Sequence, residues 1–201
     1  MGLYMSVPTM LREDARWMRL VDLVRELAFL DGGNDEAFTL ASGRTSRWFF
    51  DMKPVMMNPE AGRLVGELMN LRCDEIGADF VGGLELGAVP LAALVVATDF
   101  TSERLGFMVR KQAKGRGGRK TNNPAGIEGA SIANGGRVII LEDVTTTGGS
   151  AIQAVKRIEE ETDCEVVAVI SILDREEGGK EAFEDAGIPF ESLLVRSDIS
   201  G

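Results

Sequence analysis

VIILEDVTTTGGSAIQAV, residues Val138 to Val155, is the stretch that decides the fold of this 201-residue chain. Four apolar residues run into two acids and a valine, and three threonines, two glycines and a serine follow before apolar residues recur at helical spacing. This order predicts a buried strand, a tight turn and a helix. A ligand at that turn would have to match two carboxylates, a row of hydroxyl groups and a glycine-rich backbone.

The rest of the chain alternates between the two kinds of element. Continuous apolar strands alternating with helices predict an α/β fold, with a central parallel sheet covered by helices on both faces. We expect an amphipathic helix from about Glu13 to Leu30 and a second from Pro59 to Ile76, where Asn58 caps a proline start. Further helices are expected at 89–98, 150–162 and 180–187, a strand–turn–strand at 38–54, and strands at 79–84, 105–111, 138–141, 165–174 and 190–195.

Composition excludes several classes of protein. The formal net charge of −10 argues against general nucleic-acid binding, which needs a basic footprint. No run approaches the roughly 20 apolar residues of a membrane span, and the start MGLYMSVPTMLRED lacks the pattern of a secretory signal. We therefore expect a cytoplasmic protein. Cys73 and Cys164 are expected to be small buried core residues, and the lack of histidine excludes a histidine base or metal ligand.

The strand end predicts an anion site beside two acids. Ligands of parallel sheets bind beyond the carboxyl ends of the strands, where Glu142 and Asp143 follow the apolar run. We expect Thr145 to Gly149 to form the turn and a helix starting near Ser150 to point its N-terminus at the same place. Free N–H groups, the helix dipole and the hydroxyl groups suit a phosphate, and the glycine pair permits close backbone approach.

Other phosphate loops do not fit this turn. A P-loop needs a lysine after its glycine, where Ser150 stands, and the G-x-G-x-x-G dinucleotide pattern is absent. The two acids would repel a phosphate, so they must face another group. The vicinal hydroxyls of a ribose, or a divalent metal bound to that ribose, would suit them. A ribose 5-phosphate therefore matches both the acid pair and the turn after it. The alternative is a solvated acidic loop with ordinary helix caps.

LEDVTTTGGSAI resembles the phosphoribosyl-pyrophosphate (PRPP) motif of the type I phosphoribosyltransferases. From FTLASGRTS to LDREEGG the chain is similar to one branch of them, the orotate phosphoribosyltransferases. The resemblance implies one domain over residues 1–201, with a small N-terminal hood over about 1–60 and a PRPP-binding core over about 61–201. It implies ribose binding by Glu142 and Asp143, the latter also catalytic, and a PRPP site completed by Val144, Thr145, Thr146, Thr147, Gly148, Gly149 and Ser150.

Residues 110–129 have little apolar content, which is typical of a functional lid or of disorder. Six cations occur there without an acid among them: Arg110, Lys111, Lys114, Arg116, Arg119 and Lys120. A solvated charged loop is the alternative. The pattern VRKQAK resembles the family's lid, which implies PRPP contacts by Arg110, Lys111, Lys114 and Arg116 and catalytic roles for Lys111 and Lys114, partly in the neighbouring subunit of a homodimer. Many relatives have a histidine where Arg116 stands, so a proton-shuttling role does not carry over.

The resemblance also implies a pyrophosphate loop and a base site. VGGLELGAVPLA resembles the pyrophosphate loop, with backbone N–H groups at residues 85–88, although the lysine of many relatives is missing. A strand–turn–helix whose glycines serve only the turn is the alternative. FTLASGRTSRWFFDMK resembles the segment over the base and implies contacts by Phe49 and Phe50; we expect one of these two to be a core residue instead. Ala41 stands where relatives often have a lysine, and Lys53 is a candidate replacement.

Arg175 corresponds by position to the family's orotate-binding arginine. A guanidinium suits that role, since it can hold a carboxylate through two hydrogen bonds. Thr146 is implied near the pyrimidine. The alternative for Arg175 is a surface arginine paired with Asp174 or Glu176.

The resemblance implies transfer of the 5-phosphoribosyl group from PRPP to orotate, with Mg²⁺ bound mainly through PRPP rather than by direct protein ligands.

Three alternative functions remain. A purine phosphoribosyltransferase would share the PRPP motif, but the S-G-R-T-S segment and Arg175 argue against it. A PRPP-sensing regulator would need a DNA-binding segment that this acidic chain does not offer. A purely structural homologue would not be expected to keep both the acid pair and the lid cations.

Overall fold

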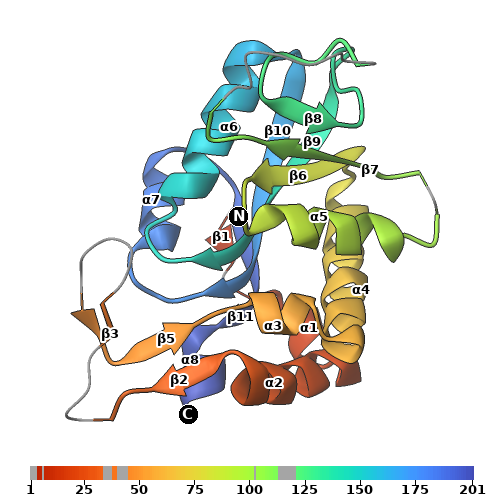
Figure 1. The fold of residues 1–201 in the computed structure, drawn as a ribbon. Helices are drawn as coiled ribbons and strands as arrows, with labels where there is room; N and C mark the ends of the chain where they lie inside the picture. Colours follow the sequence, from red (N-terminus) through yellow and green to blue (C-terminus); the bar gives the residue numbers. More distant parts are fainter. Residues whose placement is uncertain (1–3, 6, 34–37, 40–44, 102, 113–120) are drawn as a thin grey trace.

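A mixed sheet of seven strands lies at the centre of the computed structural model, which describes residues 4–5, 7–33, 38–39, 45–101, 103–112 and 121–201 (Figure 1). The strand order is β1-β11-β10-β9-β6-β7-β8. All neighbours are parallel except β8, which is antiparallel to β7. The strands are β1 (Tyr4–Met5), β6 (Phe80–Leu84), β7 (Leu105–Val109), β8 (Ile127–Gly129), β9 (Gly136–Thr145), β10 (Cys164–Asp174) and β11 (Phe190–Val195).

Helices cover both faces of this sheet because its central strands are apolar on both sides. Along β9, Ile139 and Leu141 enter one buried cluster, and Val138 and Ile140 enter the other. Each fully buried side chain of this size contributes roughly 1.5–3 kcal/mol. The first cluster includes residues of α2 (Ala15–Leu27), α4 (Pro59–Ile76) and α5 (Ala88–Ala97); the second includes residues of α6 (Gly149–Glu161) and α7 (Gly179–Asp185).

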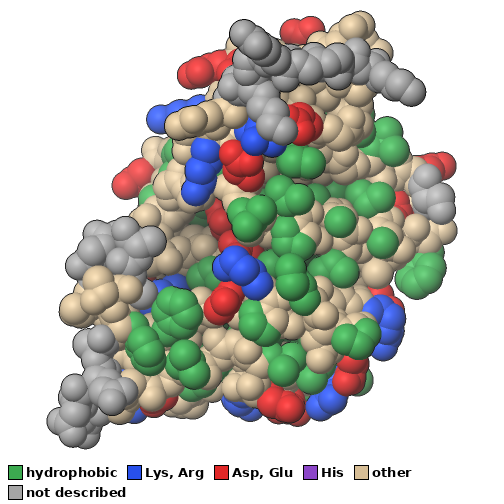
Figure 2. All heavy atoms as spheres, in the orientation of Figure 1, with side chains coloured by type: hydrophobic (Ala, Val, Ile, Leu, Met, Phe, Trp, Pro, Cys, Tyr) green, Lys and Arg blue, Asp and Glu red, His purple; other side chains and the backbone are tan. Residues whose placement is uncertain are grey.

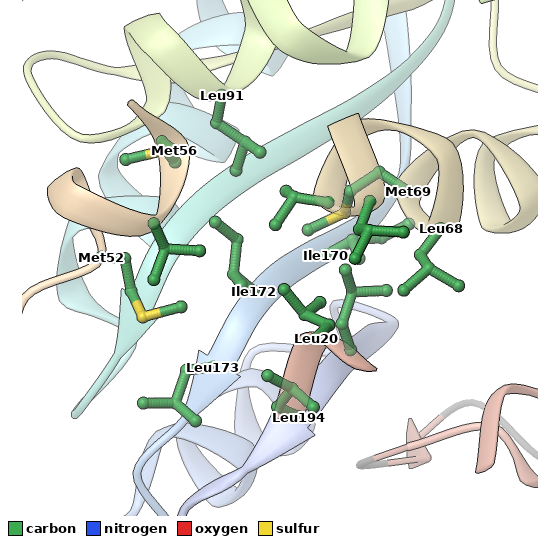
Figure 3. Packing of buried hydrophobic residues seen from close by; sticks show 14 of the residues in the cluster. Leu20, Met52, Met56, Leu68, Met69, Leu91, Ile170, Ile172, Leu173 and Leu194 are labelled. Atoms are coloured by element: carbon green, nitrogen blue, oxygen red, sulfur yellow. The ribbon is translucent and has the colours of Figure 1, made fainter. Parts of the chain in front are cut away.

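Two small antiparallel sheets lie beside the first cluster. β2 (Phe29–Asp31) pairs with β5 (Trp48–Phe50), and β3 (Phe38–Thr39) pairs with β4 (Thr45–Ser46). The short helices are α1 (Thr9–Arg12), α3 (Lys53–Met56) and α8 (Arg196–Ser200). Met52 and Met56 belong to the same buried cluster as Leu91 of α5 and Ile172 of β10 (Figure 3). This packing ties the chain after β5 to the centre of the domain.

Several sequence predictions are confirmed. The helix from Pro59 to Ile76 has the predicted bounds, and the Asn58 side chain accepts hydrogen bonds from the N–H groups of Glu60 and Ala61, both at 3.0 Å. Both cysteines are free and buried. Burial raises the pKa of the Cys73 thiol to about 12, as expected for an inert core thiol. Among the described residues, none of the helices combines the length and apolar character that crossing a membrane requires.

Other predictions are wrong in detail. The first long helix ends at Leu27 rather than Leu30, because the next residues pair with β5 and the Phe29 ring packs 5.1 Å from that of Phe50. The sheet is not wholly parallel, and β8 lies inside the segment 110–129 that was expected to lack structure. Its pairing with β7 and the burial of Ile127 order this part of the segment.

Candidate active site

The sheet reverses its strand order between β6 and β9, which are neighbours. From β6 the chain passes through α5 to β7 on one side, and from β9 it passes through α6 to β10 on the other. Such a switch point opens a crevice at the carboxyl ends of the two strands. A cavity of about 310 Å³ lies at the end of β9, and residues 49–53, residues 142–150 and Arg175 line it.

Two carboxylates stand at this edge of the sheet. Glu142 and Asp143 are the last acidic residues of β9, and both are partly buried. Burial, together with the charge and hydrogen bonding of Asp143, raises the pKa of Glu142 to about 8, although Lys111 opposes this rise. The ligand-free site therefore disfavours a second negative charge beside Asp143, and a ligand that brings hydroxyl donors or a cation would stabilise that charge.

The loop after β6 lies against the same acids. A Cβ atom added to Gly87 would stand only 2.3 Å from Oδ1 of Asp143, so a larger residue here would displace the Asp143 carboxylate. The peptide bond between Glu85 and Leu86 is cis. The carboxylate of Glu85 accepts a hydrogen bond of 2.8 Å from the backbone N–H of Lys111. The segment 85–88 thus joins the end of β7 to the acid pair.

A turn lies between β9 and α6 where the sequence predicts one, but it begins later than expected. β9 continues through Thr145, and α6 begins at Gly149, so the turn proper is shorter than residues 145–149. Gly148 has a φ of 74°, and a Cβ there would lie 3.1 Å from the ring of Phe183. The positive φ favours glycine, and the close ring leaves little room for a side chain. The first turn of α6 leaves backbone N–H groups without intrahelical partners at the cavity, and such groups suit an anion.

Thr145 has a buried hydroxyl oxygen that has no hydrogen-bond partner among the described residues. Its side chain lines the cavity although its residue is only 1% exposed. A buried polar group without a partner costs stability. A ligand oxygen at the turn would supply the missing partner.

Arg175 is a buried residue of the cavity wall, 4% exposed, and not a surface arginine. It pairs with neither Asp174 nor Glu176: its Nη2 lies 2.9 Å from Oε1 of Glu177. The same Nη2 donates hydrogen bonds of 2.9 Å to the Ser46 hydroxyl and to the Trp48 carbonyl. Its Nε is buried and has no partner among the described residues. The guanidinium is therefore held in place with donor capacity left for an anionic ligand.

The two phenylalanines have different surroundings. Both line the cavity, but Phe50 is 5% exposed and belongs to the first buried cluster, while Phe49 is half-buried. One of the two is thus a core residue, as the sequence predicts. Lys53 also lines the cavity and pairs with Asp51 at 3.0 Å, whereas Ala41 lies outside the described residues.

The lid cations are described in part. Arg110 and Lys111 follow β7 and do not line the cavity of residues 142–150. Arg110 lies 3.8 Å from Glu85 and 3.6 Å from Glu128, and its buried Nε has no partner among the described residues. Lys114 and Arg116 lie outside the described residues, as do Arg119 and Lys120.

Sequence reasoning missed the acceptors that hold Arg175. Ser46 ends the S-G-R-T-S segment that the sequence assigns to the base site, but its contact with Arg175 was not predicted, and Trp48 and Glu177 carry no recognisable signal for such a contact. It also missed Asp51 and Met52 in the cavity wall. Phe49 and Phe50, which directly precede these two residues and were assigned to the base site, were the signal that could have indicated them.

A switch-point crevice that holds an acid pair and a glycine-rich turn is the arrangement expected of a type I phosphoribosyltransferase. No family model matches the chain. It is 43% identical over 182 residues to an orotate phosphoribosyltransferase of Rhodopseudomonas palustris (strain BisB5), covering 90% of this chain and 94% of that one. It is 38% identical to that of Aquifex aeolicus (strain VF5), covering 90% and 96% of the two chains.

Among solved structures, the chain is similar to the orotate phosphoribosyltransferase of Mycobacterium tuberculosis H37Rv in complex with PRPP. The TM-score is 0.74 at 31% identity, and the match covers 92% of this chain and 99% of that one. This chain belongs to the orotate phosphoribosyltransferase family.

Proposed function

We propose that this protein transfers the 5-phosphoribosyl group of PRPP to orotate, which yields orotidine 5'-monophosphate and pyrophosphate in pyrimidine synthesis. One observation carries the proposal: a single cavity joins an anion-binding turn, an acid pair and a buried arginine with an unpartnered Nε. These three parts match the phosphate, the ribose hydroxyls and the carboxylate of the two substrates. A purine base has no carboxylate for Arg175, so the purine alternative gives its unpartnered Nε no acceptor.

Each part of the cavity has a defined task in this proposal. The N–H groups at the start of α6 and the hydroxyls of residues 145–147 and 150 bind the 5-phosphate. Glu142 and Asp143 accept hydrogen bonds from the ribose hydroxyls. Arg175 binds the orotate carboxylate, Phe49 lies against the ring, and Thr146 lies near the pyrimidine. The sugar is thereby fixed at both ends, which brings C1 and the attacking nitrogen into a reactive arrangement.

The reaction needs no covalent nucleophile. The bond from C1 to pyrophosphate breaks, orotate nitrogen forms the new bond to C1, and the proton of that nitrogen is released. Negative charge grows on pyrophosphate, and the cations of Arg110, Lys111 and Lys114 stabilise it. Gly87 lies against Asp143, and the backbone N–H groups of residues 86–88 would contact the same leaving group, whereas the N–H of Glu85 donates to the carbonyl of Val109 at 2.8 Å. Closure of the lid excludes water from the activated ribose.

The acid pair also fits a magnesium ion carried by PRPP. Burial and the nearby charge of Asp143 raise the pKa of Glu142 to about 8, and a divalent cation beside the ribose would favour the charged form of this carboxyl group. Among the described residues, no third acid or cysteine joins the pair to make a metal site of protein ligands alone. Magnesium would then be held mainly by PRPP, where it supplies positive charge to the pyrophosphate.

We further propose that the protein works as a homodimer through the outer face of α5. Hydrophobic side chains gather over α5 and the neighbouring strands (Figure 2). An apolar hollow of about 260 Å³ lies there, lined by Val89, Ala92, Ala93, Val96, Gly106, Phe107, Met108, Glu128 and Gly129. β7 runs from this hollow directly into Arg110 and the lid. A second copy seated on this face would lie beside the lid, so lid cations could reach its cavity.

The function is tested by PRPP-dependent consumption of orotate, measured beside uracil, adenine and hypoxanthine, with and without magnesium. We expect turnover with orotate alone among the four bases; turnover of a purine and none of orotate would refute the proposal. The dimer is tested separately by analytical ultracentrifugation of wild type and of Ala93→Arg, which places a charge on the exposed face of α5. A monomeric wild type would refute the interface.

A further inference from the structure

The substrate arginine is held by a second arginine that lies outside the cavity. Arg196 is the first residue of α8, and its Nε lies 3.2 Å from the carbonyl oxygen of Arg175, to which it donates a hydrogen bond. Its guanidinium also lies over the ring of Trp48, 4.5 Å from the ring centroid. Arg196 does not line the cavity, so it can act on a ligand only through the residues that it contacts.

The two neighbours control both ends of Arg175. The hydrogen bond from Arg196 fixes the backbone of Arg175. At the other end of Arg175, its Nη2 donates a hydrogen bond of 2.9 Å to the carbonyl of Trp48. Cation–π contact with the Trp48 ring holds that acceptor in place. Arg196 therefore connects the main chain of the substrate arginine to the platform that orients its guanidinium.

The peptide after Arg175 needs such a support. Glu176 has a φ of 56°, a left-handed conformation that is uncommon for a residue other than glycine. Nη2 of Arg196 lies 3.2 Å from Oε2 of Glu176, and the N–H and hydroxyl of Ser197 donate to the same carboxylate at 3.0 and 3.1 Å. The start of α8 thus ties down the turn that carries Arg175 out of β10.

We propose that Arg196 is a positioning residue that sets the affinity and selectivity of the site for the carboxylate of the base. This inference rests on the proposed function, since it concerns the same base site. The remaining parts of the cavity do not touch Arg196, so the phosphate turn and the acid pair keep their geometry when it is changed. Its removal lets the guanidinium of Arg175 leave the orientation that suits a carboxylate.

The test compares Arg196→Met with Arg196→Lys and with a matched control, Arg12→Gln. Arg12 ties the same helix α8 through an ion pair of 2.7 Å with Asp198, but it has no contact with Arg175. Steady-state kinetics with orotate and with uracil, PRPP affinity and the melting temperature are measured for all four proteins.

For Arg196→Met we expect the KM for orotate to rise about tenfold, which is the scale of one lost charge-assisted hydrogen bond. We expect kcat and PRPP affinity within about twofold of wild type, because the groups at C1 are unchanged. The preference for orotate over uracil should fall by the same factor. Arg196→Lys keeps the charge but loses the Nε donor, so its KM should also rise, and Arg12→Gln should keep the wild-type KM.

Three results would overturn the inference: an unchanged orotate KM in Arg196→Met, a wild-type KM in Arg196→Lys, or an equal rise in Arg12→Gln. If Arg196→Met does not fold, Arg196→Lys and the control decide the question. A wild type that is inactive with orotate overturns the proposed function and the inference together, whereas an active wild type with an insensitive Arg196 overturns the inference alone.

Discussion

Replacing Glu142 by glutamine should stabilise the ligand-free protein, and more so as the pH rises. Burial, with the charge and hydrogen bonding of Asp143, raises the pKa of Glu142 from 4.5 to about 8. Below pH 4.5 the carboxyl group is protonated in both the folded and the unfolded protein. Between pH 4.5 and 8 the unfolded chain releases this proton and the folded protein keeps it, so the stability of the wild type falls as the pH rises.

The size of this effect follows from the two pKa values. Each pKa unit of difference between the folded and unfolded states corresponds to about 1.36 kcal/mol. The destabilisation is therefore about 3 kcal/mol at pH 7 and roughly 4–5 kcal/mol above pH 8. For a chain of this length each kcal/mol shifts the melting temperature by about 2–4 °C. Glu142→Gln should accordingly melt roughly 10 °C above wild type at pH 8.5 and much closer to it at pH 5.

The assay is calorimetric melting of ligand-free wild type and variant between pH 5 and 9. Glu159→Gln is the matched control, because it removes one acid from the exposed face of α6 without touching the cavity. Asp143→Asn should reduce the same penalty in part, since the charge of Asp143 contributes to it. A difference in melting temperature between wild type and Glu142→Gln that does not depend on pH would falsify this reasoning.

Three further predictions concern the proposed reaction. Arg175→Ala should lower kcat/KM for orotate by about two orders of magnitude, the scale of a lost charged hydrogen-bond pair, and leave PRPP affinity nearly unchanged; wild-type kinetics would exclude Arg175 from the base site. Lys114→Ala should reduce turnover by about 10²–10³, and mixing it with inactive Asp143→Asn should restore part of the activity; no recovery despite subunit exchange would exclude a shared site. Gly87→Ala would place a Cβ 2.3 Å from Oδ1 of Asp143, so calorimetry should show weaker PRPP binding in a protein that still folds; unchanged binding would separate this loop from the PRPP site.

Local rules determined the elements that the sequence predicted well. Asn58 and the proline after it specify a helix start through a side-chain acceptor and a fixed φ, and the structure has that start. The apolar run 138–141 is buried as expected because both faces of β9 are covered. Periodicity misplaced the end of the first long helix, since Leu30 continues the helical pattern and yet lies in β2, 54% exposed. Pairing with β5, a contact between distant parts of the chain, overrode the local pattern there.

The sequence by itself determined the α/β class and the chemical character of the site, because strand, turn and helix signals and the acid–threonine–glycine string lie within one continuous stretch. The tertiary structure alone decided which groups meet there. It placed Gly87 against Asp143 and raised the pKa of Glu142, and it held Arg175 between β4, β5 and Glu177. Such effects depend on burial and on distances between residues far apart in the chain, and no local pattern of residues encodes these quantities.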